Sequence, residues 1–315
     1  MGKLPKQVLL VCVFLFTLPA KLLADPLSDA QHAYDMGNYA KAATLYRPLA
    51  EQGVVSAQSD LGTIYAKGLG VPQDYKEAAK WFRLAAEEVD AYSQYNLALL
   101  YENGQGVAQD YKEAINWYQL AAVQGYAMAQ CNLGTLYYLG RGVPQDYKEA
   151  MKWYQLAAEQ NIAAAKFSLG IMYAKGQGVP QNYNEAAEWY MLAAEQGHVL
   201  GQFNSGVMYD KGQGVPQNSK EAAKWYMLAA IQGNAAAQNN IAAMYAKGQG
   251  VPQDYVLAYM WASIAAADKD EQKKSTETRE LVEKLMTPDK IAEAQELTTK
   301  CIAKKFKGCQ QVKLK

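Results

Sequence analysis

Few residues in this 315-residue chain have the types and the spacing that catalysis or metal binding requires. There are only two histidines, His32 and His198, and they lie far apart in the sequence. A two-histidine metal site, or a histidine that activates a nucleophile, needs such side chains close together. We expect both to be exposed in polar turns, and we therefore predict no catalytic residue, no metal site and no cofactor.

Two motifs that could indicate chemistry were tested against their required context. No serine is followed three residues later by lysine, the Ser-x-x-Lys pair of β-lactamases. A Gly-x-Gly-Val segment does recur, but no predicted strand precedes it and no Gly-Lys-Ser/Thr follows it, as a phosphate loop would need. We read this segment as a turn between helices. One enzymatic function nevertheless remains an alternative for this chain, namely an envelope hydrolase or a regulator of one.

The cysteines permit one short-range disulfide. If a single helix ran through Cys301 and Cys309, their separation would be about 12 Å, too far for a bridge. Gly308 can end that helix and turn Cys309 back. We predict a Cys301–Cys309 disulfide that clamps the C-terminal end, with Cys131 as a free thiol.

The elements that carry these residues repeat at a fixed interval. All six tryptophans lie 36 residues apart: Trp81, Trp117, Trp153, Trp189, Trp225 and Trp261. We call positions separated by this interval equivalent. Self-similarity at such a period is typical of a solenoid, in which each unit buries its apolar face only against its neighbours.

Each period contains two amphipathic helical patterns. The first, as in Ala57, Leu61 and Ile64, carries Gly or Ala at the position of Gly62, which indicates close helix packing. The second follows an N-cap such as Asp74, with a glutamate three residues on that could complete a capping box. Glycine usually ends this second helix, but Val89 stands at that position, and we expect the turn there to be rebuilt.

These residues carry a family resemblance. The stretch Leu169–Gly197 reads L-G-x-x-Y-x-x-G-x-G-V-P-Q-N-Y-x-E-A-x-x-W-Y-x-x-A-A-E-Q-G, which resembles the Sel-one-like repeat (SLR), a relative of the tetratricopeptide repeat. The resemblance covers about residues 38–267. It implies an all-α, right-handed α/α solenoid used as a scaffold or adaptor for other proteins, common in bacterial envelopes and in host-facing secretion.

The positions that vary among repeats suggest where a partner binds. In the tetratricopeptide geometry the first helix of each pair lines a concave face, and its exposed positions are small or polar in the outer repeats. In the middle repeats they are large and apolar: Tyr92, Tyr95, Leu99, Met128, Tyr138, Phe167, Ile171, Phe203 and Val207. We predict that a hydrophobic peptide or helix of another protein binds this groove. The alternative is that these side chains fill the seam between neighbouring helices.

The charge balance and the N-terminal sequence limit which functions and locations remain for this chain. Lys and Arg together number 31, as do Asp and Glu, so the chain lacks the basic balance typical of nucleic-acid binding. Residues 1–24 resemble a signal peptide, with Lys3 and Lys6 before an apolar run that is too short to span a membrane. We predict no membrane span, and a bacterial protein that is exported and starts at Asp25, or alternatively at Lys21. Periplasmic and secreted locations, including a host-directed factor, remain alternatives.

The predicted organisation has three parts. Residues 1–24 form the signal peptide, residues 25–268 form a solenoid of about six full repeats with flanking half-repeats, and residues 269–315 form capping helices and a basic tail. The last helix is expected from Pro288 to about Phe306. The basic tail could contact a partner or an anionic lipid, although such tails are usually only solvated.

Overall fold

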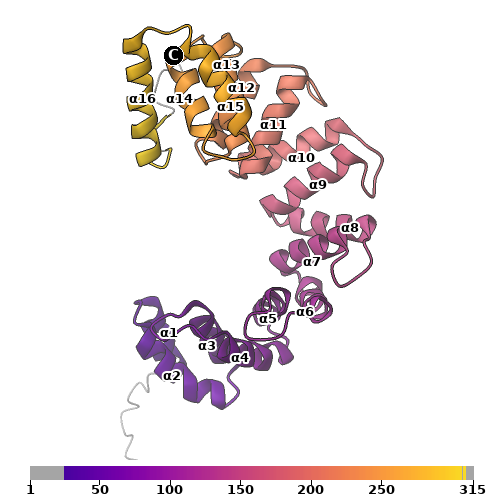
Figure 1. Cartoon of the computed structure of the whole chain (residues 1–315). Coiled ribbons are helices and arrows are strands. Elements are labelled where there is room, and N and C mark those ends of the chain that lie inside the picture. The colour runs from indigo at the N-terminus through magenta and orange to yellow at the C-terminus, as the bar shows by residue number, and fades with distance from the viewer. Residues whose placement is uncertain (1–24, 307, 310–315) are drawn as a thin grey trace, which may run out of the picture. The chain divides into compact units, whose positions relative to one another are not determined.

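The computed structural model describes residues 25–306, 308 and 309, and these residues form sixteen α-helices and no strand (Figure 1). The all-α fold built of paired helices is confirmed. The predicted signal peptide and the last six residues of the basic tail lie outside the described residues.

The chain divides into two compact units, the first ending at Glu88 and the second beginning at Val89. Unit 1 contains α1 (Pro26–Asp35), α2 (Tyr39–Glu51), α3 (Val55–Lys67) and α4 (Tyr75–Glu87). Unit 2 contains α5 (Ala91–Asn103), α6 (Tyr111–Val123), α7 (Ala127–Leu139), α8 (Tyr147–Glu159), α9 (Ala163–Lys175), α10 (Tyr183–Glu195), α11 (Val199–Lys211), α12 (Ser219–Ala230), α13 (Ala235–Lys247), α14 (Tyr255–Ala265), α15 (Gln272–Glu283) and α16 (Pro288–Ala303).

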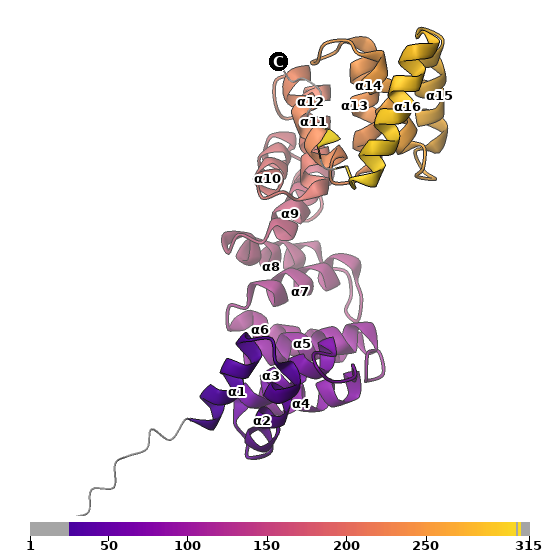
Figure 2. The ribbon, with the colours of Figure 1, turned by 90° about the vertical axis from the view of Figure 1, so that its left-hand side faces the viewer.

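Within unit 2 the helices α5 to α14 are five antiparallel pairs. We call the first helix of each pair the A helix and the second the B helix. Each A helix packs on its own B helix, and each B helix packs on the next A helix (Figure 2). Because every pair covers the apolar face of the one before it, the buried apolar residues form successive clusters along unit 2.

Local signals start and stop these helices as the sequence indicates. The side chain of Asp146 accepts hydrogen bonds from the backbone N–H groups of Lys148 and Glu149, at 2.9 and 3.0 Å. The A helices end at a left-handed glycine, such as Gly140 with φ 67°. Val89 also takes a left-handed conformation, with φ 67°, so the expected rebuilding of that turn is wrong.

In the four pairs from α5 to α12, the centre of the core is the tyrosine that follows the tryptophan of the B helix, whereas in α14 the tryptophan itself, Trp261, is fully buried and Ala262 follows it. Tyr118, Tyr154 and Tyr226 are at most 2% exposed, whereas Trp153 is half-buried. The glycine of the A helix faces this ring, since a Cβ on Gly134 would lie 2.9 Å from Cδ1 of Tyr154. The predicted close helix approach is therefore present, and the ring that it accommodates belongs to tyrosine.

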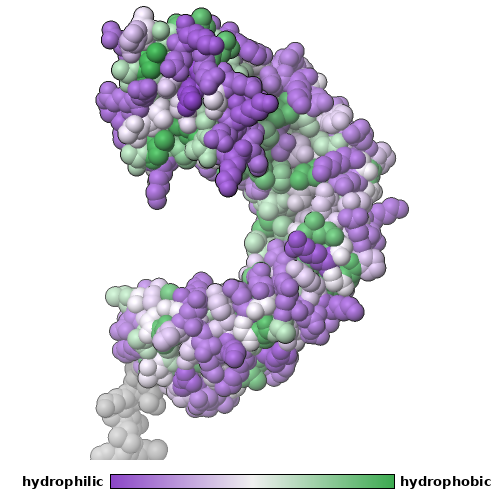
Figure 3. Space-filling view, viewed as in Figure 1, coloured by the Kyte–Doolittle hydropathy of each residue, from purple (hydrophilic) through white to green (hydrophobic). Residues whose placement is uncertain are grey.

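The surface is mostly hydrophilic on the face shown in Figure 3.

A row of buried glutamines joins each B helix to the next A helix. The amide of Gln238 donates to the carbonyl of Ala230, at 3.0 Å, and Gln130 and Gln202 bond equivalently to Ala122 and Ala194. Each of these carbonyls, near the C-terminal end of a B helix, also accepts the N–H of the glycine three residues on, so the glutamine is its second donor and links the two helices. Lys166 occupies the same position in α9 and is 7% exposed.

The two glycines of each Gly-x-Gly turn have different roles. Gly212 ends α11, and a Cβ there would lie 3.2 Å from Cβ of Gln217. Gly214 lies directly on the N-terminus of α10 in the preceding pair, where a Cβ would come within 1.9 Å of the carbonyl oxygen of Tyr183. The second glycine is therefore a contact between repeats, in addition to being part of a turn.

We expect Gly214→Ala to destabilise unit 2 more than Gly212→Ala. Both substitutions place alanine in the left-handed region, at a cost of about 1–2 kcal/mol. Only Gly214→Ala also forces two backbone segments apart, which adds about 1–3 kcal/mol. Urea unfolding followed by circular dichroism measures the difference, and equal losses would show that the turn conformation alone matters.

The last two helices pack on the end of unit 2. Helix α15 contacts α13 and α14, and α16 contacts α14. Helix α16 ends at Ala303, earlier than expected, because Lys305 and Phe306 take positive φ values of 48° and 66°.

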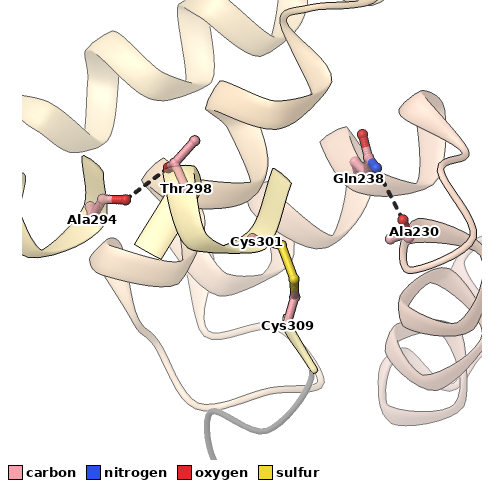
Figure 4. The surroundings of a disulfide bond; sticks show 6 residues. All are labelled: Ala230, Gln238, Ala294, Thr298, Cys301 and Cys309. Carbon is pink, nitrogen blue, oxygen red and sulfur yellow. Dashed lines mark hydrogen bonds between the residues drawn. A yellow bond between two sulfur atoms is a disulfide. The ribbon is translucent and has the colours of Figure 1, made fainter. Parts of the chain in front are cut away.

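This reversal of the chain brings two sulfurs together. Cys301 and Cys309 form a disulfide, with their Cα atoms 5.6 Å apart (Figure 4). The turn that permits the bridge begins at Lys305, before Gly308, which also has a positive φ. The disulfide therefore closes a short loop at the end of α16.

Candidate partner-binding surface

The nine residues predicted to bind a partner all lie in unit 2, on the A helices α5, α7, α9 and α11. We call this set, together with Leu200 of α11, the A-helix surface. Apolar and neutral residues gather along the left-hand edge of the middle of unit 2 in Figure 3, where α7 and α9 lie in Figure 1. The members of the set differ in how far they are exposed.

Three members are exposed, and all of them lie in the first turn of an A helix. Tyr92 of α5 is 36% exposed, Met128 of α7 is 42% exposed and Leu200 of α11 is 46% exposed. Tyr92 packs edge-on against Tyr126, with ring centroids 6.4 Å apart. Large apolar side chains with this exposure are available to a second molecule.

Three aromatic members are half-buried and pack on the core tyrosines. The rings of Tyr95, Phe167 and Phe203 lie 5.9, 5.7 and 5.9 Å from the rings of the B-helix tyrosines in their own pairs. These tyrosines are Tyr118, Tyr190 and Tyr226. Burial raises the pKa of Tyr95, so its hydroxyl stays neutral. One side of each ring is thus used for packing, while part of it remains accessible.

The remaining members contribute to packing as well. Leu99, Ile171 and Val207 are half-buried against the cores of their pairs. Tyr138 packs edge-on against Tyr147, with centroids 5.4 Å apart, and its hydroxyl donates to Oε1 of Gln177 at 2.8 Å. Gln177 lies in the loop after α9, so Tyr138 connects two successive pairs.

The end of the array differs from the middle for a structural reason. Asn239, at the position equivalent to Tyr95 and Phe203, is 1% exposed and lies within 3.1 Å of the hydroxyl oxygen of Ser275 in α15. A polar residue stands at this position because α15 covers it and supplies a hydrogen-bond partner. Asn239 is therefore not a polar residue of an open groove.

Two residues of this surface were missed by the sequence reasoning. Tyr126 and His198 are the N-cap residues of α7 and α11, and their rings lie 5.0 Å from Tyr95 and 4.7 Å from Phe167. His198 is half-buried, not exposed as expected. Its Nδ1 accepts from the N–H of Gly201 at 3.1 Å, and burial lowers its pKa. The sequence does contain a signal for these two residues, because Tyr95 is followed 31 residues later by the ring of Tyr126, and Phe167 is followed at the same interval by the ring of His198.

The described residues offer little for catalysis. None of their histidine, cysteine, aspartate and glutamate side chains form a group of three or more that could hold a metal ion. Cys131 is buried, and burial raises the pKa of its thiol to about 11, so it is protonated and unreactive at neutral pH. Within residues 25–306, 308 and 309, no helix has the length and apolar character needed to cross a bilayer.

The chain matches known proteins over most of its length. The Sel1 repeat model matches residues 55–90, 91–126, 127–162, 163–198, 199–234 and 235–270. A comparison with the curated proteins found no match.

Two solved structures have similar sequences and folds. The first is c5321, a protective antigen of uropathogenic Escherichia coli strains with an SLR fold. It is 31% identical, with a TM-score of 0.81, over 92% of this chain and 64% of that chain, so this chain spans about two thirds of its length. The second is a Sel1 repeat protein from Oxalobacter formigenes, 33% identical with a TM-score of 0.70 over 77% of this chain and 97% of that chain.

Sel1 repeat proteins are generally scaffolds for protein interactions and are generally not enzymes. The six matched repeats and the two similar structures show that this chain belongs to the Sel1 repeat family.

Proposed function

We propose that this protein is an exported scaffold that binds a hydrophobic peptide or helix of a partner protein on the A-helix surface of unit 2, without catalysing a reaction. The observation that carries this proposal is the exposure of three large apolar side chains, Tyr92, Met128 and Leu200, each in the first turn of an A helix. Large apolar side chains that are exposed among polar neighbours on one surface often mark a binding site.

The half-buried aromatic residues support the same function. Tyr95 and Phe167 are each held between a core tyrosine and the ring of the next N-cap residue. Side chains that are already fixed lose little conformational entropy when a partner binds. They would form a rigid floor, with Tyr92 and Leu200 as exposed contacts beside it. An apolar helix or an apolar extended peptide suits this surface better than an acidic tail does.

The exposed residues allow binding to be separated from stability. We expect the triple variant Tyr92→Ala, Met128→Ala, Leu200→Ala to bind the partner more weakly than the wild type does. Each of these side chains that is a binding hot spot should contribute a loss of about 2 kcal/mol or more in binding free energy. Its thermal unfolding should remain close to that of the wild type, because these side chains are exposed. Affinity capture with mass spectrometry identifies the partner, and titration calorimetry with that partner measures the loss.

The chain provides a matched control on its other helices. Leu120, Leu156 and Leu192 are 47, 42 and 41% exposed on the B helices α6, α8 and α10. The triple alanine variant at these leucines removes similar apolar area from another surface and should leave binding intact. Loss of binding in this control, with binding kept in the A-helix variant, would place the partner on the B helices.

Export is the second part of the proposal. The N-terminal sequence supports it, and the similar structure named as a protective antigen of a pathogen supports a location accessible to the host. The alternatives are a periplasmic scaffold and a host-directed factor. We expect the mature chain to begin at Asp25, and N-terminal sequencing of the exported protein that finds Met1 would contradict this.

A further inference from the structure

The start of helix α11 depends on a histidine. His198 is the N-cap residue, and its Nδ1 accepts a hydrogen bond from the backbone N–H of Gly201 at 3.1 Å. This N–H is among the first in the helix, which have no partner within the helix. Two other A helices have a side-chain cap bond at the equivalent position, from Asp90 in α5 and Asn234 in α13. Of these three caps, His198 is the one whose charge changes near neutral pH.

The first turn of α11 is poorly suited to form without this bond. Its residues 199–201 are valine, leucine and glycine, whereas residues 163–165 of α9 and 235–237 of α13 are all alanine. Alanine has the highest helix propensity, and valine and glycine have lower ones. The glycine lies close against α10, where a Cβ would be 3.0 Å from Cβ of Ala193. The cap bond therefore supports a turn that packs closely but favours the helix only weakly.

Protonation of the imidazole removes this cap bond. Nδ1 of His198 accepts a hydrogen bond only while the ring is neutral, because both nitrogens of an imidazolium are donors. An imidazolium would also place a positive charge at the positive end of the helix dipole. Gly201 is buried, so water has little access to its N–H once the acceptor is lost. The first turn would then contain an unsatisfied donor facing another donor.

Burial governs the protonation of His198. The imidazole packs on the ring of Phe167, with centroids 4.7 Å apart, and burial lowers its pKa. At this end of the helices around it, the ionised side chains are those of Lys166 in α9 and Glu195 in α10. The ammonium of Lys166 donates to Oδ1 of Asn161 at 2.9 Å, and Glu195 is exposed. The other charged residues of α9, α10, α11 and α12 lie in the opposite halves of these helices.

The direction of this pKa shift sets the pH range in which the cap is lost. Because the pKa is lowered, the folded protein resists protonation of His198 more than the unfolded chain does. The stability that His198 contributes is complete above about pH 6.5, the usual pKa of histidine, and is lost as the pH falls through its lower value in the folded state. Leu200, an exposed member of the A-helix surface, lies in the turn that this loss affects.

We propose that the start of α11 is an acid-sensitive switch in the A-helix surface: protonation of His198 breaks its bond to Gly201 and releases the first turn of α11, including Leu200. The use of this switch rests on the function proposed above, because a partner held by Leu200 at neutral pH would lose that contact in mild acid. The conformational change itself belongs to the free protein.

Amide hydrogen exchange, followed by NMR on the free protein, tests the switch. Protection factors, which correct for the intrinsic effect of pH on exchange, are compared at about pH 7.5 and about pH 5. Protection of the Gly201 N–H should fall about fivefold or more in acid, the effect of losing a cap. The equivalent N–H of Ala237, which donates to Asn234 at 2.8 Å, should keep its protection.

The histidine ring resonances show whether protonation accompanies this loss. The Cε1–H signal of His198 should titrate below about pH 6.5 together with the fall in protection of Gly201. A His32→Gln protein assigns the signals, since the chain has only these two histidines. A ring that stays neutral down to about pH 4, or one that titrates while the protection of Gly201 is unchanged, would overturn the proposal.

Two substitutions use residues that the chain itself has at the equivalent position. His198→Asn should retain the cap bond, as Asn234 does, and keep the protection of Gly201 at both pH values. His198→Tyr should keep a ring beside Phe167 but lack the cap bond, as Tyr126 does, and show low protection at both. Equal acid sensitivity in His198→Asn would assign the effect to another group and overturn the proposal. Protection that rises in acid would also overturn it, because attraction of the imidazolium to the Phe167 ring would then outweigh the lost bond.

These measurements are independent of partner binding. Exchange is measured without a partner, and the alanine variants of the A-helix surface are compared with the wild type at neutral pH, where His198 is uncharged. Failure of the switch therefore leaves the proposed binding intact, and failure of the binding leaves the switch intact.

Discussion

Replacing Tyr154 with alanine should lower the free energy of unfolding by about 3–5 kcal/mol, the usual cost of removing a large aromatic ring from a core. Tyr154 is 2% exposed, and its ring packs against the backbone of Gly134 in the paired A helix. Its hydroxyl also lies 3.1 Å from Oγ1 of Thr135. The cavity cannot close, because two helices hold each other at the distance that the ring requires. Urea unfolding followed by circular dichroism measures the loss.

Two matched variants test this explanation. Trp153→Ala should cost clearly less than Tyr154→Ala, because Trp153 is only half-buried although it is the larger residue. Tyr154→Phe should cost only about 1 kcal/mol, the typical contribution of one hydrogen bond. If Trp153→Ala proves the more damaging substitution, the tryptophan is the central core residue and the assignment of the tyrosine is wrong.

Removing the Cys301–Cys309 disulfide should lower stability by about 2–3 kcal/mol. The bridge joins residues eight positions apart and restricts the unfolded chain at that end. In the folded state both cysteines belong to the core formed by α12 to α16, and Phe306 of the closed loop packs against that core. Without the bridge, the turn that begins at Lys305 must keep its left-handed residues unaided.

Only the protein with an intact disulfide should show the additional stability. The Cys301→Ser, Cys309→Ser variant and the reduced wild type should unfold at the same, lower urea concentration. Reducing agent should not change the variant further, and Cys131→Ser should keep the response of the wild type to reductant, since Cys131 is a free thiol. A wild type whose unfolding is insensitive to reductant would show that the bridge does not stabilise the end of the array.

The architecture of this protein was predictable from its sequence. The 36-residue interval, the Asp and Asn caps and the glycine ends are local signals, and the helices lie where these signals place them. In a solenoid each unit contacts only its neighbours, so one repeated pattern specifies the whole array. The disulfide also follows from local geometry, since only a chain reversal brings Cys309 to Cys301.

The roles of individual side chains depended on tertiary packing. Spacing places Trp153 and Tyr154 beside each other on one helix, but the direction of the neighbouring A helix decides which of them is enclosed. Helix packing likewise buries His198 against Phe167 and covers Asn239 with α15. For Val89, packing overrides a local preference that disfavours its positive φ.

A pocket lined by Ala223, Met227 and Ile241 shows the same division. The sequence by itself determined that alanine stands at position 223, as it does at the equivalent positions 79 and 187, whereas positions 115 and 151 carry isoleucine and methionine. Only the tertiary structure decided that a space remains beside Ala223, because that space is bounded by α12, α13 and the turn after α13 together. Periodicity encodes which residues face a neighbour, whereas the volume left between them depends on the distances among three separately folded segments.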